Sequence, residues 1–168
     1  MDDRTKARLD ALLHDYAGEQ DSREGEAAQE VASARRARRR FVALRDAVIE
    51  PAMREVGEYL RTRGHDYEVR SSETRDVGAG RNDEPSIALV VYPRGYSRAK
   101  LDPTHTPMVT FRAGDAPGRL RTHLVKRMPG RRGAPDAGHT YELEAVTAEV
   151  VRREILELLE AVLGRPSR

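Results

Sequence analysis

Residues 108–126 of the chain, MVTFRAGDAPGRLRTHLVK, predict a β-hairpin. Apolar and polar side chains alternate in two segments, 108–112 and 119–126, on either side of a reversal rich in glycine and proline at 114–118. Alternation with a period of two places one set of side chains against a core and the other toward solvent. A short reversal of this composition joins antiparallel strands. The side chains expected to face outward are Arg112, Arg119, Arg121 and His123.

Three further segments extend the predicted sheet. Residues 66–70 and 140–145 show the same alternation, and residues 87–92 form the longest apolar run of the chain. Their order along the sequence, with reversals between them, favours a meander of neighbouring antiparallel strands. The polar segments rich in Gly, Pro and Arg between them are expected to be loops, and they are residues 76–84, 93–106 and 129–138.

Residues 87–92 differ from the other strands because apolar side chains fill both of their faces. Val90 and Tyr92 fall on the face that is polar elsewhere in the sheet. A strand that is apolar on both sides is normally covered on both. We therefore expect another element or a partner over this patch, and Val90, Tyr92 and Tyr96 are the candidate interaction residues.

Two helices flank the strands. The helical pattern of the first helix begins at Ala27, carries an apolar stripe from Phe41 to Leu60 at spacings of three and four residues, and is closed by Gly64. Pro51 lies inside it, and its ring removes a backbone N–H, so we expect a kink or a fresh start there. The second helix begins at the capping residue Thr147. The stripes are Phe41, Leu44, Val48, Ala52, Val56, Tyr59 and Leu60 in the first helix, and Val151, Ile155, Leu158 and Val162 in the second.

The first forty residues have a different character. Residues 4–17 predict a short helix, the polar stretch 18–26 predicts a break or a frayed segment, and the helical pattern resumes at Ala27. Residues 1–30 carry four basic and nine acidic side chains, whereas residues 31–40 carry five arginines and no acid. This segregation predicts a charged arm outside the folded domain.

The sequence therefore predicts an α+β protein. A five-stranded, mostly antiparallel, meander-like sheet carries an N-terminal and a C-terminal helix on one face, within a single domain at residues 41–164. Residues 1–40 form a helical or partly disordered arm, and residues 165–168 form a tail.

Composition narrows the class of protein. Of the 168 residues, 35% are charged and 38% are hydrophobic, which suits a modest domain with a large solvated surface. The apolar run 87–92 is far shorter than the ~20 residues that cross a bilayer, and the acidic start lacks the features of a signal peptide. We expect a cytoplasmic protein with no membrane contact. The absence of cysteine excludes disulfides, thiolate zinc sites and cysteine nucleophiles.

Two basic stretches are candidate contacts for nucleic acid or another anionic partner. They comprise Arg35, Arg36, Arg38, Arg39 and Arg40 in the arm, and Arg112, Arg119, Arg121, Lys126, Arg127, Arg131 and Arg132 on the outward face and rim of the sheet. Three other interpretations stay open. The arginines of the arm could form an ordinary solvated helix face. The arm could pair antiparallel with its own copy, acidic end to basic end, and Glu142 and Glu144 could neutralise Arg121 and His123 across the sheet.

Catalytic signatures are missing from the sequence. It contains no phosphate-binding loop, no His-Glu-x-x-His pair and no nucleophile elbow. None of the five histidines is spaced to share a metal ion with another along a helix or strand. His105, His123 and His139 could meet nearby acids only through the fold. We expect no cofactor and no metal, and catalytic residues are not assigned.

The leading hypothesis is a non-enzymatic interaction or assembly module that self-associates and binds a protein partner through the charged arm or the open sheet face. The first alternative is a nucleic-acid-binding accessory protein that uses Arg35 to Arg40 and the rim at 119–132. The second alternative is a small enzyme or ligand-binding fold with a pocket rimmed by loops.

Overall fold

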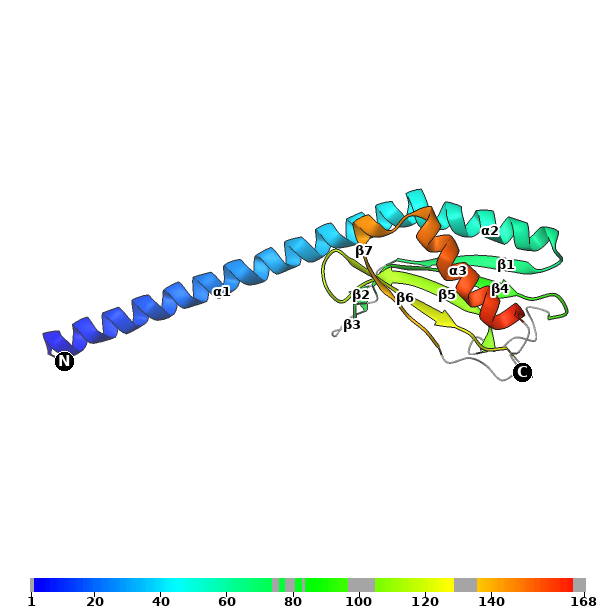
Figure 1. Cartoon of the computed structure of the whole chain (residues 1–168). Coiled ribbons are helices and arrows are strands. Elements are labelled where there is room, and N and C mark those ends of the chain that lie inside the picture. The colour runs from blue at the N-terminus through cyan, green and yellow to red at the C-terminus, as the bar shows by residue number, and fades with distance from the viewer. Residues whose placement is uncertain are drawn as a thin grey trace. The chain divides into compact units, whose positions relative to one another are not determined.

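The structure of the protein is a computed structural model. It describes residues 2–73, 76–77, 81–82, 84–96, 105–128 and 136–164. The chain divides into two units, residues 1–36 and residues 37–168, and each is described by itself. The first unit is helical, and the second holds the sheet and the helices that cover it (Figure 1).

The sheet has five antiparallel strands and confirms the predicted meander. The strands lie in the order β1-β4-β5-β6-β7, so each one pairs with the neighbour that precedes it in this sheet along the chain. Every pair is antiparallel, and the connection between β5 and β6 is a short reversal of the kind that joins antiparallel neighbours. The strands are β1 (Asp66–Ser72), β4 (Ser86–Tyr92), β5 (Met108–Ala113), β6 (Arg119–Val125) and β7 (Thr140–Glu142).

Two predicted boundaries in this region were wrong. Residues 76–84 were expected to be loop, but they contain the two-residue strands β2 (Asp76–Val77) and β3 (Arg81–Asn82), which pair with each other. The strand expected at 140–145 ends at Glu142 and continues as a turn of 3-10 helix at Leu143–Ala145. Leu143, the first residue of this turn, is still buried, so the sequence pattern alone did not reveal where pairing stops. Ala145, which was expected to face the core, is exposed, and Val146 is buried in its place.

Helices α2 (Glu50–Thr62) and α3 (Ala148–Leu163) cover the same face of the sheet, as predicted (Figure 1). Thr147 caps α3, since its Oγ1 accepts a hydrogen bond from the Val150 N–H at 3.4 Å. Apolar side chains from both helices and from the inner face of the strands form one core. Its fully buried members include Phe41, Ile49, Met53, Ile87, Leu89, Val91, Val109, Phe111, Leu120, Leu124, Val151, Ile155 and Leu158.

Pro51 lies in the first turn of α2, directly after a π-helical turn, and the backbone stays helical from one to the other, so the proline coincides with a change of helix type and not with a fresh start. The turn spans Arg45–Ile49, and the Glu50 N–H donates to the Arg45 carbonyl, five residues back. Proline has no N–H to donate to a carbonyl of the previous turn. A wider π turn before it accommodates the missing hydrogen bond. The extra residue lets Phe41 and Ile49 face the core that Met53 also enters. Tyr59, which the predicted stripe included, is 59% exposed.

Helix α1 (Asp3–Leu44) contradicts the predicted break at residues 18–26. Both glycines of this stretch, Gly18 and Gly25, lie inside the helix, and beyond the helix's own adjacent backbone no described atom lies within 4 Å of where a Cβ would be. A helical glycine costs about 1 kcal/mol, and the Glu, Gln and Arg residues between them have good helix propensity. The polar composition therefore reflects a solvated helix and not a loop. Within the described residues, no helix is long and apolar enough to cross a membrane.

Candidate functional site

The basic row on the open face of the sheet is largely neutralised by acids. Arg119 and Glu142 are partners in the β6–β7 register, and their side chains meet at 3.2 Å. Arg121 lies 3.2 Å from Asp115 in the reversal between β5 and β6. An ion pair between exposed side chains contributes little stability, but it removes the positive field on which an anionic polymer depends.

The rim that follows β6 is paired as well. Lys126 contacts Glu157 of α3 at 2.6 Å, and Arg127 contacts Asp136 at 3.2 Å. The same carboxylate of Asp136 lies 4.0 Å from His123. Arg131 and Arg132 fall outside the described residues. The predicted pairing of Glu142 with Arg121 was wrong in its register, because Glu142 pairs with Arg119.

The arginines at the C-terminal end of α1 divide into two groups. The Arg38 guanidinium donates to both carboxylate oxygens of Glu84, at 3.0 and 3.2 Å, and Arg40 pairs with Glu144. Arg35, Arg36 and Arg39 are exposed, and none of them forms an ion pair with a described residue. The basic stretch of the arm is therefore partly committed to the protein's own acids.

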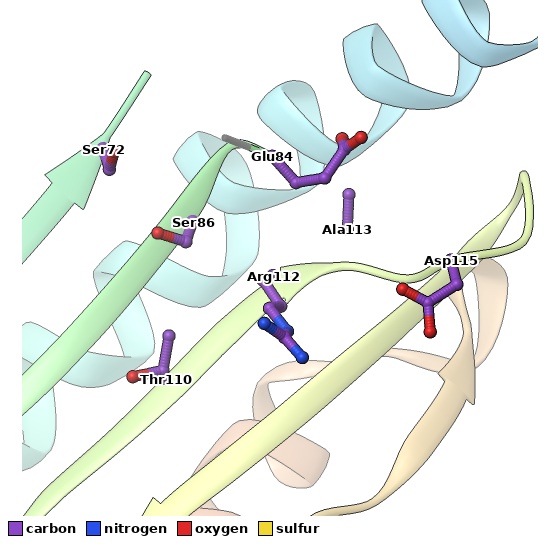
Figure 2. A pocket seen from close by; sticks show the side chains of 7 residues that line it. All are labelled: Ser72, Glu84, Ser86, Thr110, Arg112, Ala113 and Asp115. Atoms are coloured by element: carbon purple, nitrogen blue, oxygen red, sulfur yellow. The ribbon is translucent and has the colours of Figure 1, made fainter. Parts of the chain in front are cut away.

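Arg112 is the exception on the sheet. Its side chain is exposed and forms no hydrogen bond or ion pair with any described residue. It lines a cavity of about 340 Å³ at one end of the open face (Figure 2). The other lining residues are Ser72, Glu84, Ser86, Thr110, Ala113 and Asp115. We call this cavity the Arg112 pocket.

Strand register assembles the Arg112 pocket from three strands. Ser72 lies opposite Ser86 in the β1–β4 pair, and Ser86 lies opposite Arg112 in the β4–β5 pair. Thr110 lies two residues before Arg112 and therefore on the same face. Small side chains fill these positions, so the sheet surface is hollowed there. In Figure 2 the Arg112 guanidinium and the Glu84 carboxylate point away from each other.

The candidate interaction patch at Val90, Tyr92 and Tyr96 is mostly covered. Val90 is 2% exposed and Tyr92 is 5% exposed. The Tyr92 hydroxyl donates to Glu68 at 3.0 Å and accepts from Arg70 at 3.1 Å. Tyr96 is partly buried and packs against the main core. These side chains offer little surface to a second molecule.

A buried carboxylate lies on the covered face of the sheet, and it was not among the candidate site residues predicted from the sequence. Glu154 of α3 is 1% exposed. It accepts hydrogen bonds from the Thr122 hydroxyl, at 2.9 Å, and from the Tyr141 hydroxyl. The His139 ring nitrogen Nδ1 lies 3.0 Å from its Oε1. A buried acid needs such partners because its desolvation is costly.

Burial and the hydrogen bond to Glu154 raise the pKa of the Tyr141 hydroxyl. Glu157 completes the group, and its hydrogen bond from Lys126 lowers the pKa of its carboxyl. Single oxygen or nitrogen atoms of His139, Glu154 and Glu157 lie within 4.8 Å of one another. Lys126, Thr122 and Tyr141 already occupy these oxygens, so the arrangement serves as an internal network that ties α3 to the sheet.

The position of Glu154 in the sequence indicates this network. Glu154 follows Val151 by three residues and precedes Leu158 by four, which places it on the apolar stripe of its own helix. An acid at such a position predicts a buried carboxylate with polar partners. Three histidines were expected to meet acids only through the fold. Of these, His139 joins this network, and His123 lies near Asp136 on the other face of the sheet. Neither the Arg112 pocket nor a second cavity, between Val48 and Val146, is lined by a histidine.

Comparison with known proteins found no matching family model, no matching curated protein and no matching solved structure.

Proposed function

We propose that the protein is a non-enzymatic assembly module, which pairs with a second copy of itself through residues 3–36 of α1. The observation that carries this proposal is an exposed apolar cluster, the leucine patch, which comprises Leu9, Leu12, Leu13 and Tyr16. Their exposed fractions are 43%, 58%, 65% and 61%.

The leucine patch lies on one side of the helix. Its members follow one another at intervals that a helix brings to neighbouring positions. No residue in 2–36 is buried, although a helix in water gains most of its stability from packing an apolar face. A second helix laid over the patch would supply that packing.

Charge favours a second copy in the antiparallel orientation. Residues 9–21 contain four acidic residues and no lysine or arginine, whereas residues 31–36 contain Arg35 and Arg36 and no acid. Antiparallel pairing brings these segments together, while parallel pairing opposes like charges. The segment facing the leucine patch would also contribute Val31, which is 52% exposed, and a set of small side chains. These are Ala27, Ala28, Ala32 and Ala34.

Nucleic-acid binding is the alternative with less support. Five of the basic side chains proposed as contacts on the sheet and rim lie within the described residues. Four of them, Arg119, Arg121, Lys126 and Arg127, form ion pairs with acids, and Arg112 does not. Binding to phosphates by the other four would require these ion pairs to break.

Sedimentation equilibrium of the full chain tests self-association. We expect a dimer whose population rises with concentration across the micromolar range. The variant Leu13→Glu places a charge in the leucine patch and should weaken the dimer at least tenfold. Leu156→Glu is the matched control, because Leu156 is 54% exposed on α3, in the other unit of the chain.

A monomeric mass for the unsubstituted chain at every concentration would refute the proposal. Equal weakening by Leu13→Glu and Leu156→Glu would also count against it, because association would then not depend on the patch. Circular dichroism of both variants checks that the sheet domain stays folded.

A further inference from the structure

We propose that the Arg112 pocket binds the phosphate group of a small molecule, either free phosphate or a phosphomonoester. This site goes beyond the assembly function and lies entirely within residues 37–168, so it does not depend on α1 pairing.

The first argument is charge. Two acids line the pocket, but each already has its own cation. Both oxygens of Glu84 accept from Arg38, and Asp115 pairs with Arg121 at 3.2 Å. Arg112 has no acidic partner among the described residues, so its guanidinium is the uncompensated charge of the cavity. An anion is the ligand that such a site attracts.

The second argument is the set of donors. A guanidinium presents parallel N–H groups that match two oxygens of a carboxylate or a phosphate. Three hydroxyl groups, on Ser72, Ser86 and Thr110, line the same cavity. A carboxylate has only two oxygens, which the guanidinium fork would occupy. A terminal phosphate keeps a third oxygen for a hydroxyl donor, so the donor set favours phosphate.

The third argument is shape. The cavity of about 340 Å³ falls within the range of roughly 300–1,000 Å³ for small-molecule sites. A nucleic-acid backbone needs a continuous row of available cations, but Arg119 and Arg121 beside the pocket are paired with acids. A single uncompensated arginine in a hollow suits one phosphate group on a small ligand.

Backbone amide NMR shifts of the full chain at constant ionic strength test the site. The probes are inorganic phosphate, glycerol 3-phosphate and acetate, with sodium chloride as the balancing salt. We expect saturable shifts for Glu84, Ser86 and residues 110–115 with both phosphates, and at least fivefold weaker binding of acetate. Tighter binding of glycerol 3-phosphate than of inorganic phosphate would support the site and identify an ester as its ligand. Equal affinities would support it with free phosphate as the ligand.

Two variants with the same loss of charge locate the effect. Arg112→Gln should weaken phosphate binding at least tenfold. Arg119→Gln should leave it within twofold, because Arg119 is exposed on the neighbouring strand but does not line the pocket. Neither change is expected to unfold the chain, and thermal melting verifies this.

Three results would overturn the proposal: no saturable shift, equal binding of acetate and phosphate, or equal weakening by the two variants. A single-stranded oligonucleotide provides the remaining comparison. If it binds and shifts residues 119–127 as strongly as the pocket, the surface would be a nucleic-acid interface and the small-molecule site would be rejected.

Discussion

At the scale of single residues, the hydroxyl of Tyr141 makes the free energy of unfolding depend on pH in the alkaline range. Burial, followed by the hydrogen bond to Glu154, raises its pKa above the ordinary value of 10.0. The unfolded chain therefore loses this proton at a lower pH than the folded chain. The stabilisation is complete below pH 10 and is lost as the pH rises through the higher folded pKa.

Tyr141→Phe should lower the free energy of unfolding at pH 8 by about 1–2 kcal/mol, because it removes a hydrogen bond to a charged group. The difference between the two proteins should shrink as the pH rises above 10, since phenylalanine does not titrate. Urea unfolding at pH 8 and at pH 11 measures both values, and Tyr59→Phe on the exposed side of α2 is the control. A difference that stays constant across this range would show that the Tyr141 hydroxyl does not have a raised pKa.

The residues of the Arg112 pocket show how much of a candidate site the alternation of side chains along a strand can predict. The outward position of Arg112 was predicted from alternation, and the structure agrees. The pocket around it could not be predicted, because Ser72 and Ser86 reach it only through the register of two other strand pairs. Single-strand patterns state which face a side chain occupies, but not which neighbour lies beside it.

At the scale of elements, glycine has opposite roles in two helices. In α2, a Cβ at Gly57 would lie 2.4 Å from the ring of Tyr67, which is 5% exposed. That ring is held in place, because its hydroxyl donates to Glu58 at 2.5 Å and Arg61 lies over its face. In α1, a Cβ at Gly25 would have no described neighbour within 4 Å beyond the helix's own adjacent backbone.

Gly57→Ala should therefore destabilise the sheet domain, even though alanine is the better helix former. The gain in helix propensity is about 1 kcal/mol, while crowding a packed core costs about 1–3 kcal/mol. Gly25→Ala should instead increase helicity by the propensity term alone. Thermal unfolding followed by circular dichroism compares the two variants. A stabilised Gly57→Ala protein would mean that Tyr67 moves aside at little cost.

Helices and strands were predictable where one of their faces is buried, because burial imposes a periodic pattern of apolar side chains on the sequence. The sheet order and the N-terminal cap of α3 follow from alternation, reversals and Thr147, all of which are local signals. The break expected at residues 18–26 was wrong, because a solvated helix and a polar loop have the same composition when no face is buried. The end of β7 was also missed, since the buried Leu143 continues the alternation into a 3-10 turn.

At the scale of the whole molecule, the segregated charge of α1 predicts the orientation of the proposed dimer. In one variant, Asp10 and Asp15 become Arg, and in a second variant, Arg35 and Arg36 become Glu. Each variant alone places like charges together in an antiparallel pair. Four exposed ion pairs at about 0.5 kcal/mol each amount to about 2 kcal/mol, so self-association should fall roughly thirtyfold.

An equimolar mixture of the two variants should recover the affinity of the unsubstituted chain, because each acidic segment again meets a basic one. Sedimentation at low salt measures all three samples, and raising the salt should reduce the differences between them. A parallel pair behaves differently, since it already opposes like charges and the variants would then associate as well as the original chain. That outcome would reject the antiparallel orientation, while a dimer that still depends on Leu13 would preserve the leucine patch as the interface.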